Sequence, residues 1–194
     1  MDGTLCLPQN YMFALMREAL GIDKSVDILD HVHSLAPGAQ KEASLKLEEI
    51  ERKAMLEMEP QPGLTTIMSY LKENRYKVAI CTRNFPIPVD HLRTNFLKDF
   101  EIHPVITREF KPPKPAPDGI LEIARQWGLN PSQMVMVGDS LDDMAAGSDA
   151  GAATVLLRNA HNKEVEYAVE TDFIIDQLPE LISMLGGGDT EIDE

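Results

Sequence analysis

The residues best suited to chemistry lie in an acidic turn, where Gly138 is followed by Asp139, Asp142 and Asp143. Residues 134–137 before this turn are apolar and predict a buried strand that ends at the glycine. In a parallel sheet, ligands bind at the carboxyl ends of the strands. Clustered carboxylates there suit a hard cation such as Mg²⁺. A helix start also favours acidic residues, but these acids exceed what capping needs, so we predict a metal site at Asp139 and Asp143.

Polar groups also follow other predicted strands. Asp2 begins an acidic–glycine–hydroxyl–apolar run that is typical of a strand leaving a sheet through a tight turn, although so short a run is a weak signal. Residues 77–81 predict a strand that delivers Thr82 at its carboxyl end, followed by Arg83 and Asn84. Thr82 taken alone is as well explained as the cap of the next helix. Arg83 and Asn84 are candidates for contact with phosphate or substrate, with solvent as an equal alternative.

A lysine between prolines is the remaining candidate. Lys114 lies in the segment 110–117, which is rich in proline. Proline restricts the backbone on both sides, and this rigidity suits an ammonium group that must hold its position beside anionic oxygens. A proline-rich loop in solvent is the alternative. Nearby Lys111 is expected to lie on the surface.

The elements that must position these groups change in character along the chain. Residues 8–62 predict helices, because apolar residues recur at intervals of three and four. A short helix within residues 25–35 is expected to end at Pro37 and Gly38. Beyond residue 62, helices and strands alternate; the helices are expected at 65–74, 89–96, 117–127, 142–150 and 178–184, and the strands at 77–81, 105–107, 134–137, 154–157 and 173–175. This alternation predicts an α/β fold with a Rossmann-like parallel sheet, helices on both faces and an inserted helical segment.

Composition narrows the class of protein. The chain has 194 residues, 43% of them hydrophobic, and a formal net charge of −14, which argues against a nucleic-acid or anionic-membrane partner. Its two cysteines, Cys6 and Cys81, lie far apart and fit reduced thiols, as in the cytoplasm, with organellar targeting left open. No apolar run is long enough to span a membrane. Residues 187–194, glycine-rich and acidic, predict a disordered tail.

In this order, the segments resemble the motifs of the haloacid dehalogenase-like hydrolase superfamily, whose members are mostly phosphatases. The resemblance covers residues 1–157. It implies a core of residues 1–7 and 63–186 and a small helical cap of residues 8–62. The matches to the family's four motifs are, in order, Asp2-Gly3-Thr4, Thr82, Lys114 and Gly138-Asp139-Ser140-x-x-Asp143.

The resemblance implies phosphoryl transfer from a small phosphorylated metabolite through an aspartyl-phosphate. Asp2 would protonate the leaving oxygen and then activate water. Mg²⁺ would bind Asp139 and the backbone carbonyl of Asp2, with Asp143 holding the metal or its waters. Thr82 would hydrogen-bond a phosphoryl oxygen, and Lys114 would neutralise the remaining negative charge.

The chain departs from the family at its start. The family's nucleophile is an aspartate that would immediately precede Met1, and the apolar strand before it is also absent from the sequence. We therefore expect that Met1 is an internal methionine of a longer natural chain, and that the chain as written is truncated and inactive. A catalytically inactive binding or regulatory protein is the alternative function. A phospho-acceptor receiver module is disfavoured, because there the acids precede the threonine and lysine. Substrate identity and oligomeric state are not readable.

Overall fold

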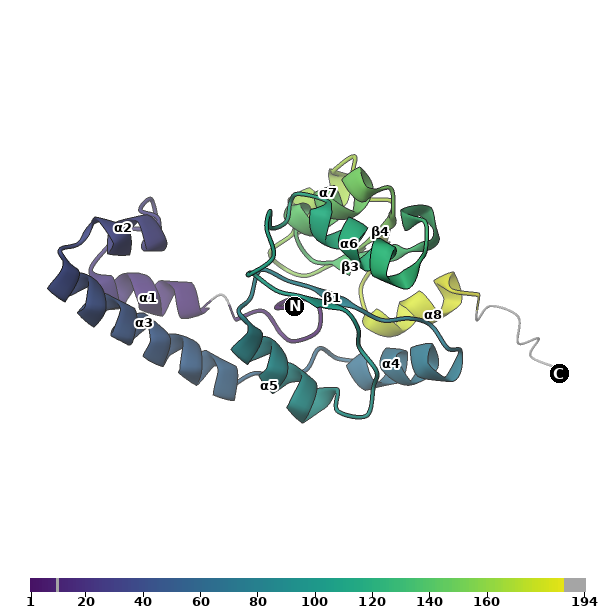
Figure 1. Cartoon of the computed structure of the whole chain (residues 1–194), viewed down its shortest axis with the longest axis horizontal. Coiled ribbons are helices and arrows are strands. Elements are labelled where there is room, and N and C mark those ends of the chain that lie inside the picture. The colour runs from purple at the N-terminus through teal and green to yellow at the C-terminus, as the bar shows by residue number, and fades with distance from the viewer. Residues whose placement is uncertain (10, 187–194) are drawn as a thin grey trace. The chain divides into compact units, whose positions relative to one another are not determined.

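The chain forms two compact units in a computed structural model that describes residues 1–9 and 11–186. The first, which we name the sheet unit, comprises Met1–Leu7 and the chain from Pro60 onward (Figure 1). The second, the helical unit, is Pro8–Glu59. The tail predicted at residues 187–194 lies outside the described residues.

The helical unit consists of α1 (Tyr11–Leu20), α2 (Ile28–Ser34) and α3 (Pro37–Leu56). Both shorter helices pack against α3, around a core of Met16, Ile28, Val32, Ala43 and Leu47. The short helix α2 ends at Ser34, before Pro37 and Gly38. The prediction that these two residues end it is wrong, because they form the first turn of α3. Proline is well tolerated there, since the first helical N–H has no partner within the helix.

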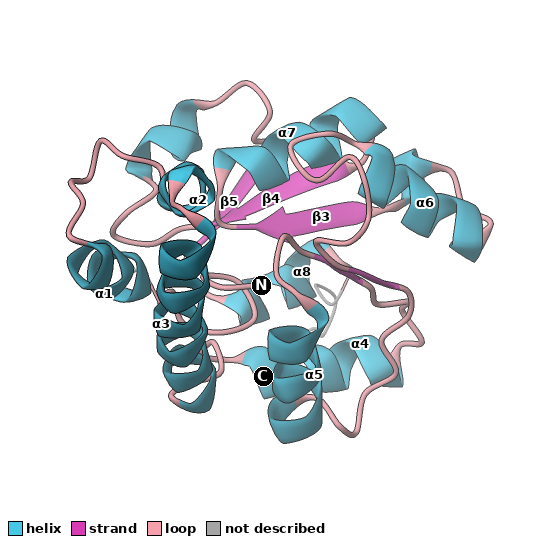
Figure 2. Ribbon diagram, turned by 60° about the vertical axis from the view of Figure 1, so that its left-hand side comes forward, coloured by secondary structure: helices cyan, strands magenta, loops and turns pink. Residues whose placement is uncertain are grey.

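The sheet unit alternates parallel strands with helices, which confirms the predicted α/β fold. Helices α6 and α7 lie on one side of the strands, and α4, α5 and α8 lie on the other (Figures 1 and 2). No helix among the described residues is both long and apolar enough to cross a membrane. The strands are β1 (Ile80–Cys81), β2 (Val105–Ile106), β3 (Val135–Gly138), β4 (Ala153–Leu157) and β5 (Phe173–Ile175). The helices are α4 (Leu64–Glu73), α5 (Pro86–Phe96), α6 (Asp118–Trp127), α7 (Leu141–Ala150) and α8 (Leu181–Met184), with 3-10 turns η1 (Pro131–Gln133), η2 (Lys163–Tyr167) and η3 (Leu178–Glu180).

The strands form two separate pieces of sheet. β1 pairs with β2, and β3, β4 and β5 pair in that order, whereas within the described part of the chain β1 and β3 do not pair. The predicted strand at 77–81 shortens to the two residues of β1. The strand predicted to be buried at 134–137 is only partly so, because Val135 is 43% exposed while Leu156 of the central β4 is fully buried. β3 is therefore an edge strand in this chain.

The acidic turn is held by the first turn of α7. The Ser140 side chain caps the helix by accepting from the Asp143 N–H, and the Asp143 carboxylate accepts from the Ser140 N–H in return. This reciprocal pair satisfies N–H groups that the helix itself cannot bond. Met144 and Ala146 are fully buried on the inner face of α7. Capping and packing together fix the turn at the carboxyl end of β3.

Candidate functional site

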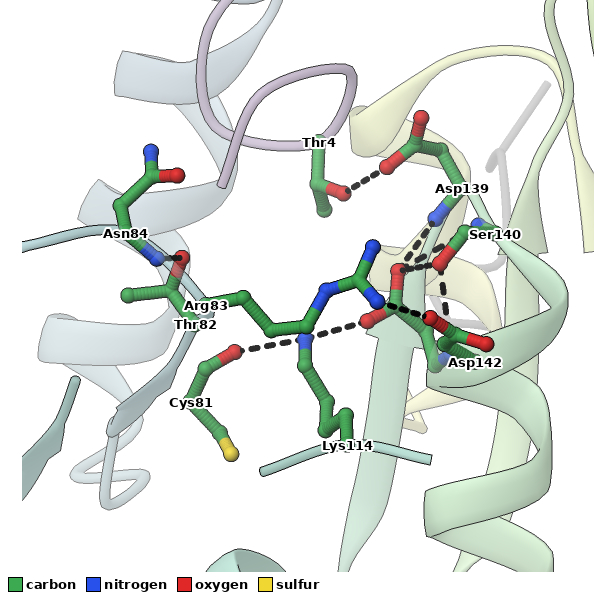
Figure 3. A network of polar contacts seen from close by, with 10 residues as sticks. Thr4, Cys81, Thr82, Arg83, Asn84, Lys114, Asp139, Ser140 and Asp142 are labelled. Carbon is green, nitrogen blue, oxygen red and sulfur yellow. Dashed lines mark hydrogen bonds and ion pairs between the residues drawn. The ribbon is translucent and has the colours of Figure 1, made fainter. Parts of the chain in front are cut away.

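The turns that follow β1 and β3 are joined by the N-terminal turn of the chain, and Figure 3 shows its Thr4 side chain bonded to Asp139. Asn84, after β1, donates from Nδ2 to Asp2 Oδ2 at 2.8 Å. Thr4 donates from Oγ1 to Asp139 Oδ1, after β3, at 2.9 Å. The N-terminal turn therefore connects the carboxyl ends of two strands that do not pair with each other.

A glycine makes this close approach possible. The Met1 carbonyl accepts from the backbone N–H groups of both Leu5 and Cys6, which closes a tight turn. Gly3 within it has a φ of 80°, and a Cβ there would overlap the Asp139 carboxylate. Only glycine meets both demands. The turn thereby places Asp2 and Asp139 at the same edge.

Lys114 bridges the two pieces of sheet. It is buried, and Nζ donates to the Cys81 carbonyl at the end of β1 at 2.8 Å and to Asp143 Oδ1 at the start of α7. A buried ammonium is stable only when it is paired and hydrogen-bonded. Both conditions are met here, so the positive charge is held at the carboxyl edge of the strands.

Asp143 is the buried partner in this pair. Burial acts to raise the pKa of the Asp143 carboxyl, but the Lys114 ammonium, the N-terminal ammonium and the Ser140 hydroxyl together outweigh it and hold that pKa below its ordinary value. Its Oδ2 accepts from the Ser140 hydroxyl at 2.8 Å and from the Asp139 N–H at 3.2 Å. Both carboxylate oxygens are therefore engaged by the protein, which suits an orienting role better than direct metal ligation.

Asp139 is in the opposite situation. Burial raises the pKa of the Asp139 carboxyl above its ordinary value, by more than the N-terminal ammonium and the Thr4 hydrogen bond lower it. No described residue donates to Asp139 Oδ2 or to the Asp2 backbone carbonyl. Mg²⁺ is usually held by one or two protein oxygens together with water and phosphate. These two oxygens fit such an ion, although no cluster of three or more acidic, histidine or cysteine side chains that could hold a metal exists among the described residues.

Thr82 is buried and is not a helix cap. The N-cap residue of α5 is Phe85, and the Thr82 Oγ1 instead accepts from the Asn84 N–H at 3.1 Å. Its own N–H donates to the Ile106 carbonyl at 2.9 Å. No described residue accepts the proton of its hydroxyl. The hydroxyl is thus available to donate to a ligand oxygen.

The two cysteines lie close to these groups but are unsuited to nucleophilic attack. Cys6 Sγ donates to Asp2 Oδ1 at 3.3 Å, and burial raises the pKa of the Cys6 thiol. Burial also raises the pKa of the Cys81 thiol. Since the thiolate is the reactive form, protonated thiols leave the chemistry to the oxygen and nitrogen groups.

The sequence did not point to Asn162, which supports the acidic turn through a hydrogen bond to its backbone. Asn162 is buried and donates from Nδ2 to the carbonyls of Asp139 and Leu157, at 2.9 and 3.0 Å. It also lines an open cleft of about 410 Å³ beside Asp139 and Ser140. No local pattern marks it, because it lies 23 residues beyond the turn that it supports. The role of Thr4 was detectable only as part of the first motif.

Comparisons with known proteins show which family this chain is similar to. The family model for haloacid dehalogenase-like hydrolases matches residues 1–151. An uncharacterised hydrolase of Saccharomyces cerevisiae is 46% identical over 193 residues, which cover 95% of this chain and 88% of the yeast protein. A phosphoglycolate phosphatase of Haemophilus influenzae is 28% identical over 126 residues, which cover 64% of this chain and 56% of that protein.

Solved structures show the same fold. The crystal structure of a predicted phosphoglycolate phosphatase from Haemophilus somnus has a TM-score of 0.78 at 20% identity, and the match covers 95% of each chain. Its identity is too low to carry more than the fold. The family model and the yeast relative carry more, because each covers most of the chain. The chain belongs to the haloacid dehalogenase-like hydrolases.

Proposed function

We propose that this chain is a Mg²⁺-dependent phosphatase that acts on a small phosphorylated metabolite. The observation that carries the proposal is the position of Lys114, buried between the Cys81 carbonyl and Asp143 at the edge where Thr82 and Asp139 also lie. A chain with a formal net charge of −14 repels anions in general. A local, fixed cation at this edge is what allows it to accept a phosphate. The similarity to a phosphoglycolate phosphatase supports the same chemistry.

The phosphate would be held by groups that follow β1 and by Lys114. The Thr82 hydroxyl donates to one phosphoryl oxygen, and the Lys114 ammonium offsets negative charge on the others. Asn84 orients the Asp2 carboxylate through its 2.8 Å hydrogen bond. These donors are fixed before the ligand arrives, so little reorganisation accompanies the reaction.

Asp139 and the Asp2 backbone carbonyl would hold Mg²⁺, and Asp143 would orient Lys114 and the acidic turn. When bound, the ion supplies positive charge that offsets the charge of the phosphoryl oxygens. The pKa of Asp139 is raised by burial, so a cation beside this carboxylate would keep it ionised.

Asp2 would act as the acid and then as the base. In the first step a carboxylate attacks phosphorus, the phosphorus–oxygen bond of the ester breaks, and Asp2 gives its proton to the leaving oxygen. In the second step Asp2 takes a proton from water as that water attacks phosphorus and releases inorganic phosphate. The attacking carboxylate would belong to the residue that the family pattern places immediately before Met1.

The split sheet supports this position for the nucleophile. The N-terminal turn contacts Asn84 after β1 and Asp139 after β3, and β1 and β3 each have one edge that pairs with no strand among the described residues. A strand leading into Met1 would pair with both. It would deliver its last side chain beside Lys114 and Thr82, as the proposed attack requires.

The test compares the 194-residue chain with a version extended at its start by an apolar strand that ends in aspartate. We expect Mg²⁺-dependent hydrolysis of p-nitrophenyl phosphate by the extended chain and negligible turnover by the shorter one, because catalytic groups that act as a unit fail together. In the extended chain, Asp2→Asn and Lys114→Ala should each remove most of the activity. Asp149→Asn, at the exposed far end of α7, is the matched control.

A catalytically inactive binding protein gives a different result. It would bind phosphate in the presence of Mg²⁺, and the extended chain would still not turn over the ester. Hydrolysis by the extended chain that survives Asp2→Asn unchanged would instead contradict the role given to Asp2.

A further inference from the structure

An ion pair spans the candidate site from one side to the other. Arg83, in the turn after β1, places Nη1 at 2.5 Å from Asp142 Oδ2, in the first turn of α7. Figure 3 shows the Arg83 side chain reaching from the Thr82 side toward Asp142. Neither residue is used by the proposed chemistry, so this pair needs its own explanation.

The Arg83–Asp142 ion pair is exposed and can dissociate more easily than the buried Lys114–Asp143 pair. The side chains of Arg83 and Asp142 are 58% and 32% exposed, whereas those of Lys114 and Asp143 are each 7% exposed. Exposed ion pairs contribute little to stability, whereas breaking a buried pair is strongly destabilising. The buried pair is therefore permanent, and Arg83 can leave Asp142 at little cost.

Asp142 also tolerates the loss of its partner. It lies in the first turn of α7, where the helix dipole favours a negative charge, and it remains in contact with solvent. Releasing Arg83 therefore leaves no buried, uncompensated carboxylate behind.

The backbone on both sides of Arg83 is held by hydrogen bonds, whereas its guanidinium is held only by the exposed ion pair with Asp142. On one side, the Thr82 N–H donates to the Ile106 carbonyl at 2.9 Å. On the other, the Asn84 carbonyl accepts from the Arg108 N–H, also at 2.9 Å. A side chain with a fixed backbone and an exposed guanidinium can reach over a bound ligand. A guanidinium binds carboxylates through paired hydrogen bonds.

We propose that Arg83 recognises a second anionic group on the phosphorylated substrate, and that Asp142 occupies Arg83 when no substrate is bound. This inference rests on the proposed phosphatase function, and it names the class of substrate: short phosphate esters that carry a carboxylate or another anionic group near the phosphate. The Asp142 carboxylate stands in for that group in the free protein. An ester without a second anionic group cannot replace Asp142 as the partner of Arg83. The ion pair therefore lowers the affinity for such an ester relative to one that carries a second anionic group.

The test measures binding by the 194-residue chain in the presence of Mg²⁺, by isothermal titration with two matched probes. One is methyl phosphate, and the other is 2-phosphoglycolate, which differs by an added carboxylate. We expect the wild-type chain to bind 2-phosphoglycolate about tenfold more tightly, as one charge-assisted interaction would provide. Arg83→Gln should bring the ratio of the two affinities to about one. Asp142→Asn should raise the preference by about two- to fivefold, because it removes the internal competitor.

The matched control is Arg125→Gln, which breaks an exposed ion pair with Glu122 near the carboxyl end of α6. It should leave the ratio as in the wild type. A wild-type ratio near one, or a ratio that survives Arg83→Gln, would overturn the role of Arg83 while leaving the phosphatase proposal standing. A wild-type chain that binds neither probe would also overturn the role of Arg83, whereas the phosphatase proposal is decided by the turnover of the extended chain.

Discussion

The Thr4 hydroxyl and the Asp139 carboxylate, 135 positions apart in the sequence, are joined by a hydrogen bond of 2.9 Å. This contact fastens the N-terminal turn to the acidic turn, and it provides a hydrogen bond to a carboxylate whose pKa is raised by burial. Thr4 itself is buried. The bond therefore matters both to stability and to the geometry of the proposed cation site.

Replacing Thr4 with valine keeps the shape and removes the donor. We expect Thr4→Val to lower the free energy of unfolding by about 1–3 kcal/mol, because a buried carboxylate oxygen loses its partner. Urea denaturation measures this loss. Thr65→Val, an exposed threonine on α4, is the control and should change stability by less than about 0.5 kcal/mol. Equal midpoints for the two variants would contradict the importance of the bond.

Binding of Mg²⁺ should depend on Asp139. In a chain extended to include the preceding strand, Asp139→Ala should abolish the heat of Mg²⁺ binding in isothermal titration, because its carboxylate is the proposed direct ligand. Asp149→Asn should bind as the parent does. Undiminished Mg²⁺ affinity in Asp139→Ala would remove Asp139 from the site.

The Lys114–Asp143 pair makes a prediction about pH. The pKa of Asp143 is lower in the folded protein than its ordinary value, so the ionised carboxylate stabilises the fold at pH values above the unfolded pKa of about 3.9. That stabilisation is lost as the pH falls through the folded pKa. Without divalent cations, Asp143→Asn should cost about 3–5 kcal/mol at pH 7, because it leaves a buried ammonium unpaired.

The same comparison repeated in acid gives the check. The difference in unfolding free energy between the wild type and Asp143→Asn should shrink as the pH falls below about 4. The double variant Lys114→Met with Asp143→Leu should be more stable at pH 7 than Asp143→Asn, because it removes both charges at once. A wild-type advantage that is constant with pH would show that Asp143 is not held ionised by Lys114.

The split between β1 and β3 predicts a gain in stability when a strand is supplied. An apolar strand added before Met1 should pair with both edges and raise the unfolding free energy by several kcal/mol, since each satisfied buried group contributes about 1–3 kcal/mol. Urea midpoints of the two chains measure the gain. Hydrogen exchange should slow at Val137 of β3 and at Cys81 of β1, because the N–H of the neighbouring Ile80 already donates to Pro104 on the β2 side. An extended chain with the same midpoint and exchange rates would mean that the sheet closes in another way.

Much of the fold could be predicted from local patterns. The helices predicted at 117–127 and 142–150 correspond to α6 and α7, because a helix depends mainly on neighbours within one or two turns. The prediction at Pro37 failed, because a proline that follows one helix can also form the first turn of the next. The strand at 77–81 was predicted too long, because its length depends on a partner strand rather than on its own residues.

The sequence by itself determined the α/β class, and its resemblance to the motifs of the family named Asp2, Thr82, Lys114 and Asp139 as candidate site residues. Only the tertiary structure decided how these groups are used. It engaged Asp143 with Lys114, left Asp139 Oδ2 without a donor among the described residues, and set Arg83 against Asp142. The physical reason is that hydrogen bonding, burial and charge interaction depend on distance through space, and the fold brings together residues whose separation in the sequence carries no such information.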